Sequence, residues 1–213
     1  MAIQRSALAY LPEQKRDFIR AFQQPAAYPV GVQHPTQSAR SVPVVATWRW
    51  DPAIRGQKAF IRTVGGTHTE YWAHVDFDRG YRDGFLSFLE SEKGVTRASV
   101  PSTLHADHLL NKAFALRHGL GYVRMALVEG EFNMDYGRKI EKNLTQSQAR
   151  DNSQYLFDYI VLMKALHIKP PTDPDDYRTR REDIASYLEA AGAEKRELAL
   201  QGMDGIFKLW DVL

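Results

Sequence analysis

The sequence predicts an α+β protein whose elements fall into three parts along the chain. Runs of β-branched and aromatic residues predict an antiparallel β-meander, a strand-strand-helix pattern with polar joints follows it, and the last sixty residues have helical apolar spacing. We therefore expect an N-terminal helix and Pro-rich arm over 1–41, the meander and the β-β-α unit over 42–169, and an acidic helical extension over 170–213.

The first forty residues predict a helix followed by an extended arm. Apolar residues at helical spacing predict a helix over 2–22, with Pro12 near its start because proline is best tolerated in the first turn. The next twenty residues are rich in Pro, Gln, Ser and Gly, a composition typical of a linker or a wrapping arm.

Three segments then have the character of neighbouring strands. The segments 42–50, 58–64 and 69–77 are rich in branched and aromatic residues, and a Gly-Gly pair separates the last two. They predict a three-stranded meander. The sequence after it has apolar residues at helical spacing and predicts a helix that ends at Gly94.

The second half of the chain predicts the β-β-α unit. A short extended segment is expected over 96–104, a helix over 107–119, and a strand over 121–130. Asn133 is expected to be the N-cap of the helix that follows. The remaining segments up to the end of the chain predict helices.

Composition and charge restrict the function classes. The chain has no cysteine, which excludes disulfides and thiolate metal sites and leaves His, Asp, Glu or Asn as metal ligands. The net charge is +2, with +4 over 1–50 and −4 over 151–213, which indicates different partners, contact between the two ends, or scattered solvated charge. No apolar run approaches 18 residues, so we expect a soluble protein, cytoplasmic or exported without a signal peptide.

The polar joints of the β-β-α unit suggest a site. Asp107 and His108 end the first strand and Asn133 begins the last helix, so these side chains can converge. A divalent ion held by Asp107 and Asn133 would neutralise charge on a phosphate, while His108 accepts a proton from water. The alternative is that Asp107 only caps the following helix.

These residues resemble a known family. The segments "ADHL", "YVRMALV" and "FNMDYG" resemble the HNH, or ββα-metal, endonuclease superfamily over residues 100–145. The resemblance implies a ββα-metal nuclease core with His108 as general base, Asp107 and Asn133 as metal ligands, and Mg²⁺ as cofactor, with Mn²⁺, Ni²⁺ or Zn²⁺ as alternatives. The second His of the family signature is absent, and Asn133 takes its place.

A wider pattern is similar to nuclease domains of bacterial polymorphic toxins, including type VI secretion effectors. This similarity implies delivery by a secretion system and an immunity protein as partner. We expect a DNase of little sequence preference, because no segment resembles a base-reading helix or a zinc module, with RNA left open as the alternative substrate. His105, Asn111 and Glu141 are candidate supporting residues of the site, although His105 also fits a surface histidine and Glu141 a salt-bridge partner.

Cationic side chains near the motif are candidate phosphate contacts, because such contacts supply most of the affinity for nucleic acid. They are Arg124, Arg138, Lys139 and Lys142. Alternating Lys and Glu is equally typical of a solvated helix face. Two other functions stay open: a different metallohydrolase that recruits His68 or His74, and a non-enzymatic module that binds protein through the meander and the acidic tail.

Overall fold

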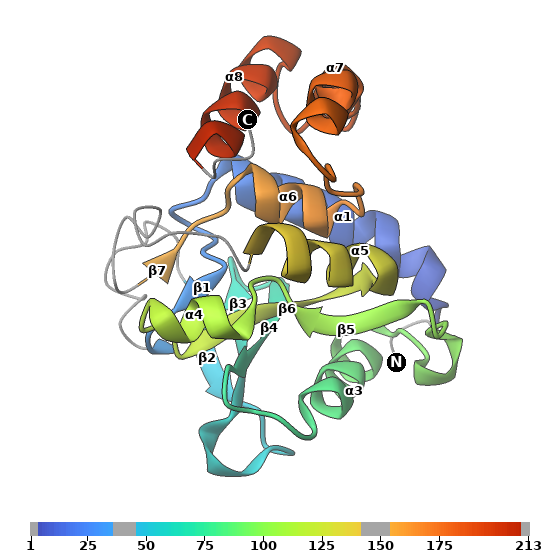
Figure 1. Ribbon diagram of the computed structural model, residues 1–213. Helices are drawn as coiled ribbons and strands as arrows, with labels where there is room; N and C mark the ends of the chain where they lie inside the picture. The colour runs from blue at the N-terminus through green and yellow to red at the C-terminus, as the bar shows by residue number, and fades with distance from the viewer. Residues whose placement is uncertain (1–3, 36–45, 142–153, 210–213) are drawn as a thin grey trace.

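An antiparallel sheet runs through the molecule, and helices cover both of its faces (Figure 1). The structure is a computed structural model that describes residues 4–35, 46–141 and 154–209. Within these residues the sheet has seven strands, and all of its strand pairs are antiparallel. The fold is therefore mixed α and β, as the composition of the segments predicts. No helix in the described part of the chain is long and apolar enough to cross a membrane.

The predicted meander is present. It consists of β2 (Ala46–Trp50), β3 (Ala59–Val64) and β4 (His68–His74), each paired with the next. Gly65 and Gly66 form the tight turn between β3 and β4 with φ of 58° and 77°, in the left-handed region that favours glycine. The Gly-Gly signal therefore sets the register of this hairpin.

The strand β6 (Tyr122–Glu129) is the centre of the sheet. Its first half pairs with β4 on one edge and with β1 (Gly31–Val32) on the other, and β7 (Gln154–Tyr155) lies beyond β1. Its second half pairs with β5 (Leu104–His108). The predicted arm is thus a sheet strand at 31–32, because its apolar residues are buried there; the rest of the arm beyond residue 35 lies outside the described residues.

The N-terminal helix α1 (Ala7–Gln23) begins later than the predicted range of 2–22 and contains Pro12. Ser6 caps it by accepting a hydrogen bond from the backbone N–H of Ala9. Pro12 therefore lies inside the helix, and the expectation that it marks the helix start was wrong. The carbonyl that loses its partner belongs to Leu8, whose side chain is 63% exposed, so water can reach this turn.

Two helices flank the joints of the β-β-α unit. The helix α3 (Tyr81–Lys93) ends at Gly94 with φ of 67°, as predicted. The helix α4 (Lys112–Arg117) begins later than predicted, because Asn111 caps it and the strand β5 continues through Asp107. Asp107 is therefore a strand residue and not a helix cap. Short 3-10 turns, η1 (Arg55–Gln57) and η2 (Arg97–Ser99), precede β3 and β5.

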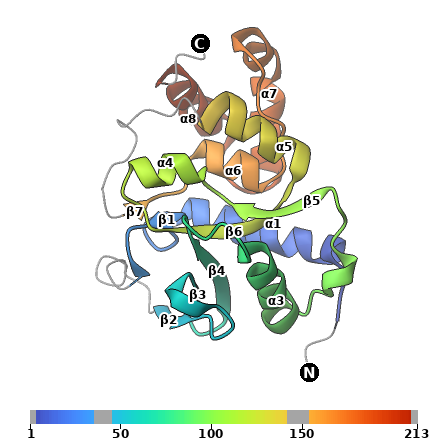
Figure 2. The same ribbon diagram turned by 60° about the horizontal axis from the view of Figure 1, so that its bottom comes forward.

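The helix α5 (Gly130–Asp135) begins directly where β6 ends and continues as a π-helical turn, η3 (Tyr136–Ile140). Asn133 is therefore an interior residue, and its expected role as N-cap was wrong. Gly130 permits this tight connection, since a Cβ there would come within 2.5 Å of Nε2 of His105. The two views place α5 and α3 on opposite sides of β5 and β6 (Figures 1 and 2).

The last part of the described chain is helical, as predicted. It contains α6 (Tyr159–Ala165), α7 (Pro174–Ala190) and α8 (Arg196–Leu209). The helix α6 packs on α1, and α7 and α8 pack on each other. Leu162 of α6 and Ile184 of α7 belong to the same buried cluster as residues of α1 and β6. The acidic extension thus shares a core with the sheet.

A buried charge cluster joins three strands of the sheet. The carboxylate of Glu70 on β4 has no exposed surface and lies 3.1 Å from Nη1 of Arg62 on β3 and 3.0 Å from Nη1 of Arg124 on β6. The guanidinium of Arg124 also stacks over the ring of Phe18. Trp72 donates its Nε1–H to the same carboxylate. Arg124 is therefore a structural residue, and its expected role in phosphate binding was wrong.

Replacement of Glu70 tests how far the sheet depends on this cluster. Glu70→Gln leaves two buried guanidinium groups without their shared anion, so we expect the free energy of unfolding to fall by about 3–5 kcal/mol. The measurement is urea denaturation followed by circular dichroism. The matched control is Glu92→Gln, which breaks the exposed pair with Arg49 and should change stability by less than about 1 kcal/mol. Equal losses in both variants would contradict this view of Glu70.

Candidate functional site

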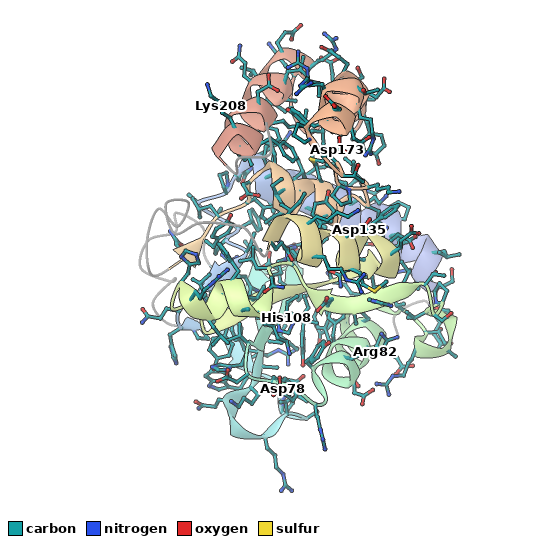
Figure 3. The ribbon with its side chains drawn as sticks, viewed as in Figure 1. Asp78, Arg82, His108, Asp135, Asp173 and Lys208 are labelled. Carbon is teal, nitrogen blue, oxygen red and sulfur yellow. The ribbon has the colours of Figure 1, made fainter. Side chains whose placement is uncertain are left out.

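The structure brings Asp107 and Asn133 into contact. Asp107 is the penultimate residue of β5, and Asn133 lies on α5, which crosses over β5 and β6. Nδ2 of Asn133 donates a hydrogen bond to Oδ2 of Asp107. His108 is the last residue of β5 and lies beside them, between Asp135 on α5 and Arg82 on α3 in the view of Figure 3.

Strand alternation explains which side chains face the site. Leu104 and Ala106 pack into the apolar cluster under the sheet, together with Phe85 of α3. His105 and Asp107 point to the other face, where α5 covers them. The pair of His108 with Met125 is the last one between β5 and β6, so Asp107 and His108 lie at the end of the strand.

The imidazole of His108 is almost completely buried. Its side chain is 1% exposed, and its ring centroid lies 5.1 Å from that of Tyr81. Nδ1 is 3.7 Å from Oδ1 of Asp107, too far for a hydrogen bond, and neither ring nitrogen has a hydrogen-bond partner among the described residues. Burial lowers the pKa of His108 below its ordinary value, against the opposing effect of the Asp107 carboxylate. The ring is therefore neutral at neutral pH.

Asp107 carries the complementary charge. Burial acts to raise the pKa of its carboxyl group, but contact with His108, the positive charge of Lys164 and the hydrogen bond from Asn133 together hold that pKa well below its ordinary value. The ionised carboxylate of Asp107 can serve as a ligand for a cation, and the neutral imidazole of His108 can accept a proton.

These groups line one pocket of about 390 Å³. Its polar lining consists of Asp107, His108, Asn111, Lys112, Asn133, Glu141 and Lys164. Glu141 is buried and bonds through Oε1 to Nζ of Lys164 at 3.0 Å, and Nζ also donates to the carbonyl oxygen of His108 at 3.2 Å. Glu141 is thus a salt-bridge partner within the site.

Sequence reasoning missed Lys164, although a signal for it exists. Lys164 is the one charged residue in the apolar stretch 159–168. A helix that is apolar on all sides is buried, so a lysine within it needs a buried anion. The anion that it finds is Glu141, which lies 23 residues earlier in the chain.

The two other candidate supporting residues, His105 and Asn111, differ in their position relative to the pocket. His105 packs its ring against Gly130 at the start of α5 and does not line the pocket. Asn111 lines the pocket, but its Oδ1 accepts hydrogen bonds from the backbone N–H groups of Ala113 and Phe114 and so caps α4. Asn111 therefore holds the wall of the pocket in place.

The cations that the sequence predicts as phosphate contacts lie in different parts of the structure. Arg138 and Lys139 are exposed on η3, where Lys139 pairs with Asp135 at 3.4 Å, and Lys142 lies outside the described residues. Arg124 is buried in the Glu70 cluster. Lys112, which the sequence did not single out, lines the pocket instead.

The donor set fits one hard cation. Asp107 offers carboxylate oxygens and Asn133 an amide oxygen, and Mg²⁺ is commonly held by one or two carboxylates together with waters and substrate phosphate. Binding by both residues requires that the Asn133 amide presents its oxygen to the ion instead of the nitrogen that now faces Asp107. Among the residues that the structure describes, no three His, Cys, Asp or Glu side chains form a group that could hold a metal ion.

The histidines of the alternative hydrolase lie outside this pocket. His68 lies 3.3 Å from Glu70 and 3.4 Å from Asp17, and His74 lies beside Asp76 and the ring of Tyr122. A His-rich zinc site would need at least one of them at the pocket.

No protein-family model, curated protein or solved structure matches this chain.

A titration of the ring of His108 tests the electrostatics of the site. We expect its pKa to lie below the ordinary value of 6.5 and to fall further in Asp107→Asn, because that change removes the carboxylate that favours the charged ring. NMR of the imidazole signals measures both values. His118 is the internal control, since burial and Arg117 lower its pKa and Asp107 does not contribute.

The same shift predicts how stability depends on pH. The unfolded chain binds a proton at His108 more readily than the folded chain, so its contribution to stability is present above pH 6.5 and is lost as the pH falls through the folded-state pKa. A His108 pKa above 6.5, or a rise in Asp107→Asn, would contradict this account.

Proposed function

We propose that this protein is a metal-dependent nuclease of the HNH type that hydrolyses phosphodiester bonds in nucleic acid. The observation that carries the proposal is the convergence of Asp107, His108 and Asn133 on one polar pocket at the end of a β-β-α unit. The strands β5 and β6 and the helix α5 would be the ββα-metal core that the resemblance implies.

The proposed roles follow from the chemistry of each group. Asp107 and Asn133 would hold a divalent ion, most simply Mg²⁺. When bound, that ion would neutralise charge on the scissile phosphate and stabilise the leaving oxygen. The ionised state of Asp107 and the amide of Asn133 match this need for hard oxygen ligands.

His108 would be the general base. Its neutral imidazole can accept a proton from the attacking water, and the packing of Tyr81 against the ring fixes the orientation of the imidazole. Asp107 lies on the Nδ1 side, so Nε2 is the nitrogen left to accept the proton. Burial supports this role, because it lowers the pKa of the imidazole and so keeps the ring unprotonated at neutral pH.

The proposed substrate is DNA, read without sequence preference. Lys112 at the pocket and the exposed Arg138 and Lys139 on η3 are the cations from which phosphate contacts would come. The wider similarity to polymorphic toxins supports a role as an antibacterial effector. A producing cell would then need an immunity protein that covers the pocket.

Digestion of plasmid DNA with Mg²⁺ or Mn²⁺ tests the proposal. His108→Ala and Asn133→Ala should each lower the cleavage rate by about 100-fold or more, the usual contribution of a positioned base or a metal ligand. EDTA should stop cleavage by the unaltered protein. Met134→Ala is the matched control, since Met134 is exposed on the same helix and should retain activity. Full activity in both site variants would exclude this assignment.

A further inference from the structure

The pocket contains a second carboxylate whose charge the proposed mechanism does not use. Glu141 lines the same pocket as Asp107 and Asn133, and its side chain is 3% exposed. Carboxylates at such a position commonly extend a metal site, because a divalent ion gains from each additional oxygen ligand. What this carboxylate contacts therefore decides how many ligands the pocket can offer.

The contact of Glu141 is an ammonium group from another helix. Nζ of Lys164 lies 3.0 Å from Oε1 of Glu141, and the side chain of Lys164 is 2% exposed. The surroundings of this pair on α6 are apolar, since Ile160 to Ala165 are all buried. An ion pair at this depth is little screened by solvent, so the two charges stay together.

Lys164 is also tied to the end of β5. Its Nζ donates a hydrogen bond to the carbonyl oxygen of His108 at 3.2 Å, so the ammonium is held between Glu141 and the strand that carries Asp107. One cation therefore already links the buried carboxylate of Glu141 to the strand that carries the proposed ligand Asp107.

The charge balance of the pocket follows from this arrangement. Lys112, the other cation of the lining, lies 3.6 Å from Asp78 and over the ring of Tyr81. Lys164 compensates Glu141 directly, so Asp107 is the carboxylate left for an added ion.

We propose, on the basis of the nuclease site proposed above, that Lys164 is a positioning residue whose ammonium acts as a built-in second cation. It takes Glu141 out of the ligand set, limits the pocket to a single divalent ion on Asp107 and Asn133, and sets the affinity for that ion.

The test is the affinity for Mn²⁺, measured by calorimetry on the full chain without substrate. Lys164→Met should raise the affinity at least tenfold or add a second bound ion, because Glu141 becomes a free ligand. Glu141→Gln should lower it at least tenfold, because the ammonium then acts uncompensated beside Asp107. The double variant Glu141→Gln/Lys164→Met removes both charges and should return to within about threefold of the original affinity.

The set stays decisive if one variant fails to fold. Lys164→Met alone leaves a buried unpaired carboxylate, whereas the double variant contains no unpaired charge and is expected to fold. The comparison of Glu141→Gln with the double variant then carries the test. If Lys164 has only a structural role, the variants should differ in stability, and their affinities for Mn²⁺ should be unchanged or should all fall by the same factor.

The outcomes separate this inference from the proposed function. If the unaltered protein binds Mn²⁺ and all folded variants bind it equally, the inference is overturned and the nuclease proposal stands. If only Lys164→Met binds Mn²⁺, the unaltered protein holds no ion, so the single-ion site of this inference and the nuclease proposal are both overturned. If none of the four proteins binds Mn²⁺, both are overturned.

Discussion

Glu70 shares its carboxylate between Arg62 and Arg124 in a part of the sheet from which solvent is excluded. Two guanidinium groups and one carboxylate can be buried together only if their strands lie in a single register, since a slip by one residue would leave a charge unpaired. The cluster therefore fixes β3, β4 and β6 relative to one another. Arg124 extends this constraint through its backbone, because its N–H bonds to the carbonyl of Val30 and its carbonyl accepts from the N–H of Leu109. The end of β5, where the site lies, is thus held by the residue that closes the charge cluster.

The same strand also determines where α5 lies. The strand β6 passes into α5 without a loop, and the lack of a side chain at Gly130 lets the ring of His105 fill the corner. On the other edge of β6, the side-chain amide of Gln14 exchanges two hydrogen bonds with the backbone of Leu127, at 2.8 and 2.9 Å, and so takes the place of a neighbouring strand. Both edges of β6 are therefore bonded, and α5 returns over β5 and β6 with Asn133 in contact with Asp107.

The pocket that results is lined by an ionised acid, a neutral base and an acid-lysine ion pair. Asp107 and His108 are neighbours in sequence, and burial disfavours the charged form of both. The contacts of Asp107 outweigh this effect and keep the acid ionised, whereas those of His108 do not, so the imidazole is neutral. This division of roles suits hydrolysis of a phosphodiester, which needs an anionic ligand for a cation and a base that is free at neutral pH. Lys164 lines the same pocket and pairs with Glu141 at 3.0 Å, so one acid of the pocket already has a cation beside it.

The sequence by itself determined the local elements and the two halves of the site. Alternation and the pair Gly65-Gly66 predicted the meander, Gly94 predicted the end of α3, and the order strand, strand, helix predicted that Asp107 and Asn133 would converge. Only the tertiary structure decided which charged side chains would be free. Arg124 and Lys164 are each buried against a carboxylate distant in sequence, Glu70 and Glu141, and the sequence does not identify either partner. The physical reason is that periodicity reports which face of an element is apolar, whereas the partner of a buried charge depends on how distant elements pack. For the same reason the sequence did not predict the strand at Gly31–Val32. Two residues are too few to show a strand periodicity, and they form a strand only because they pair with β6 and β7.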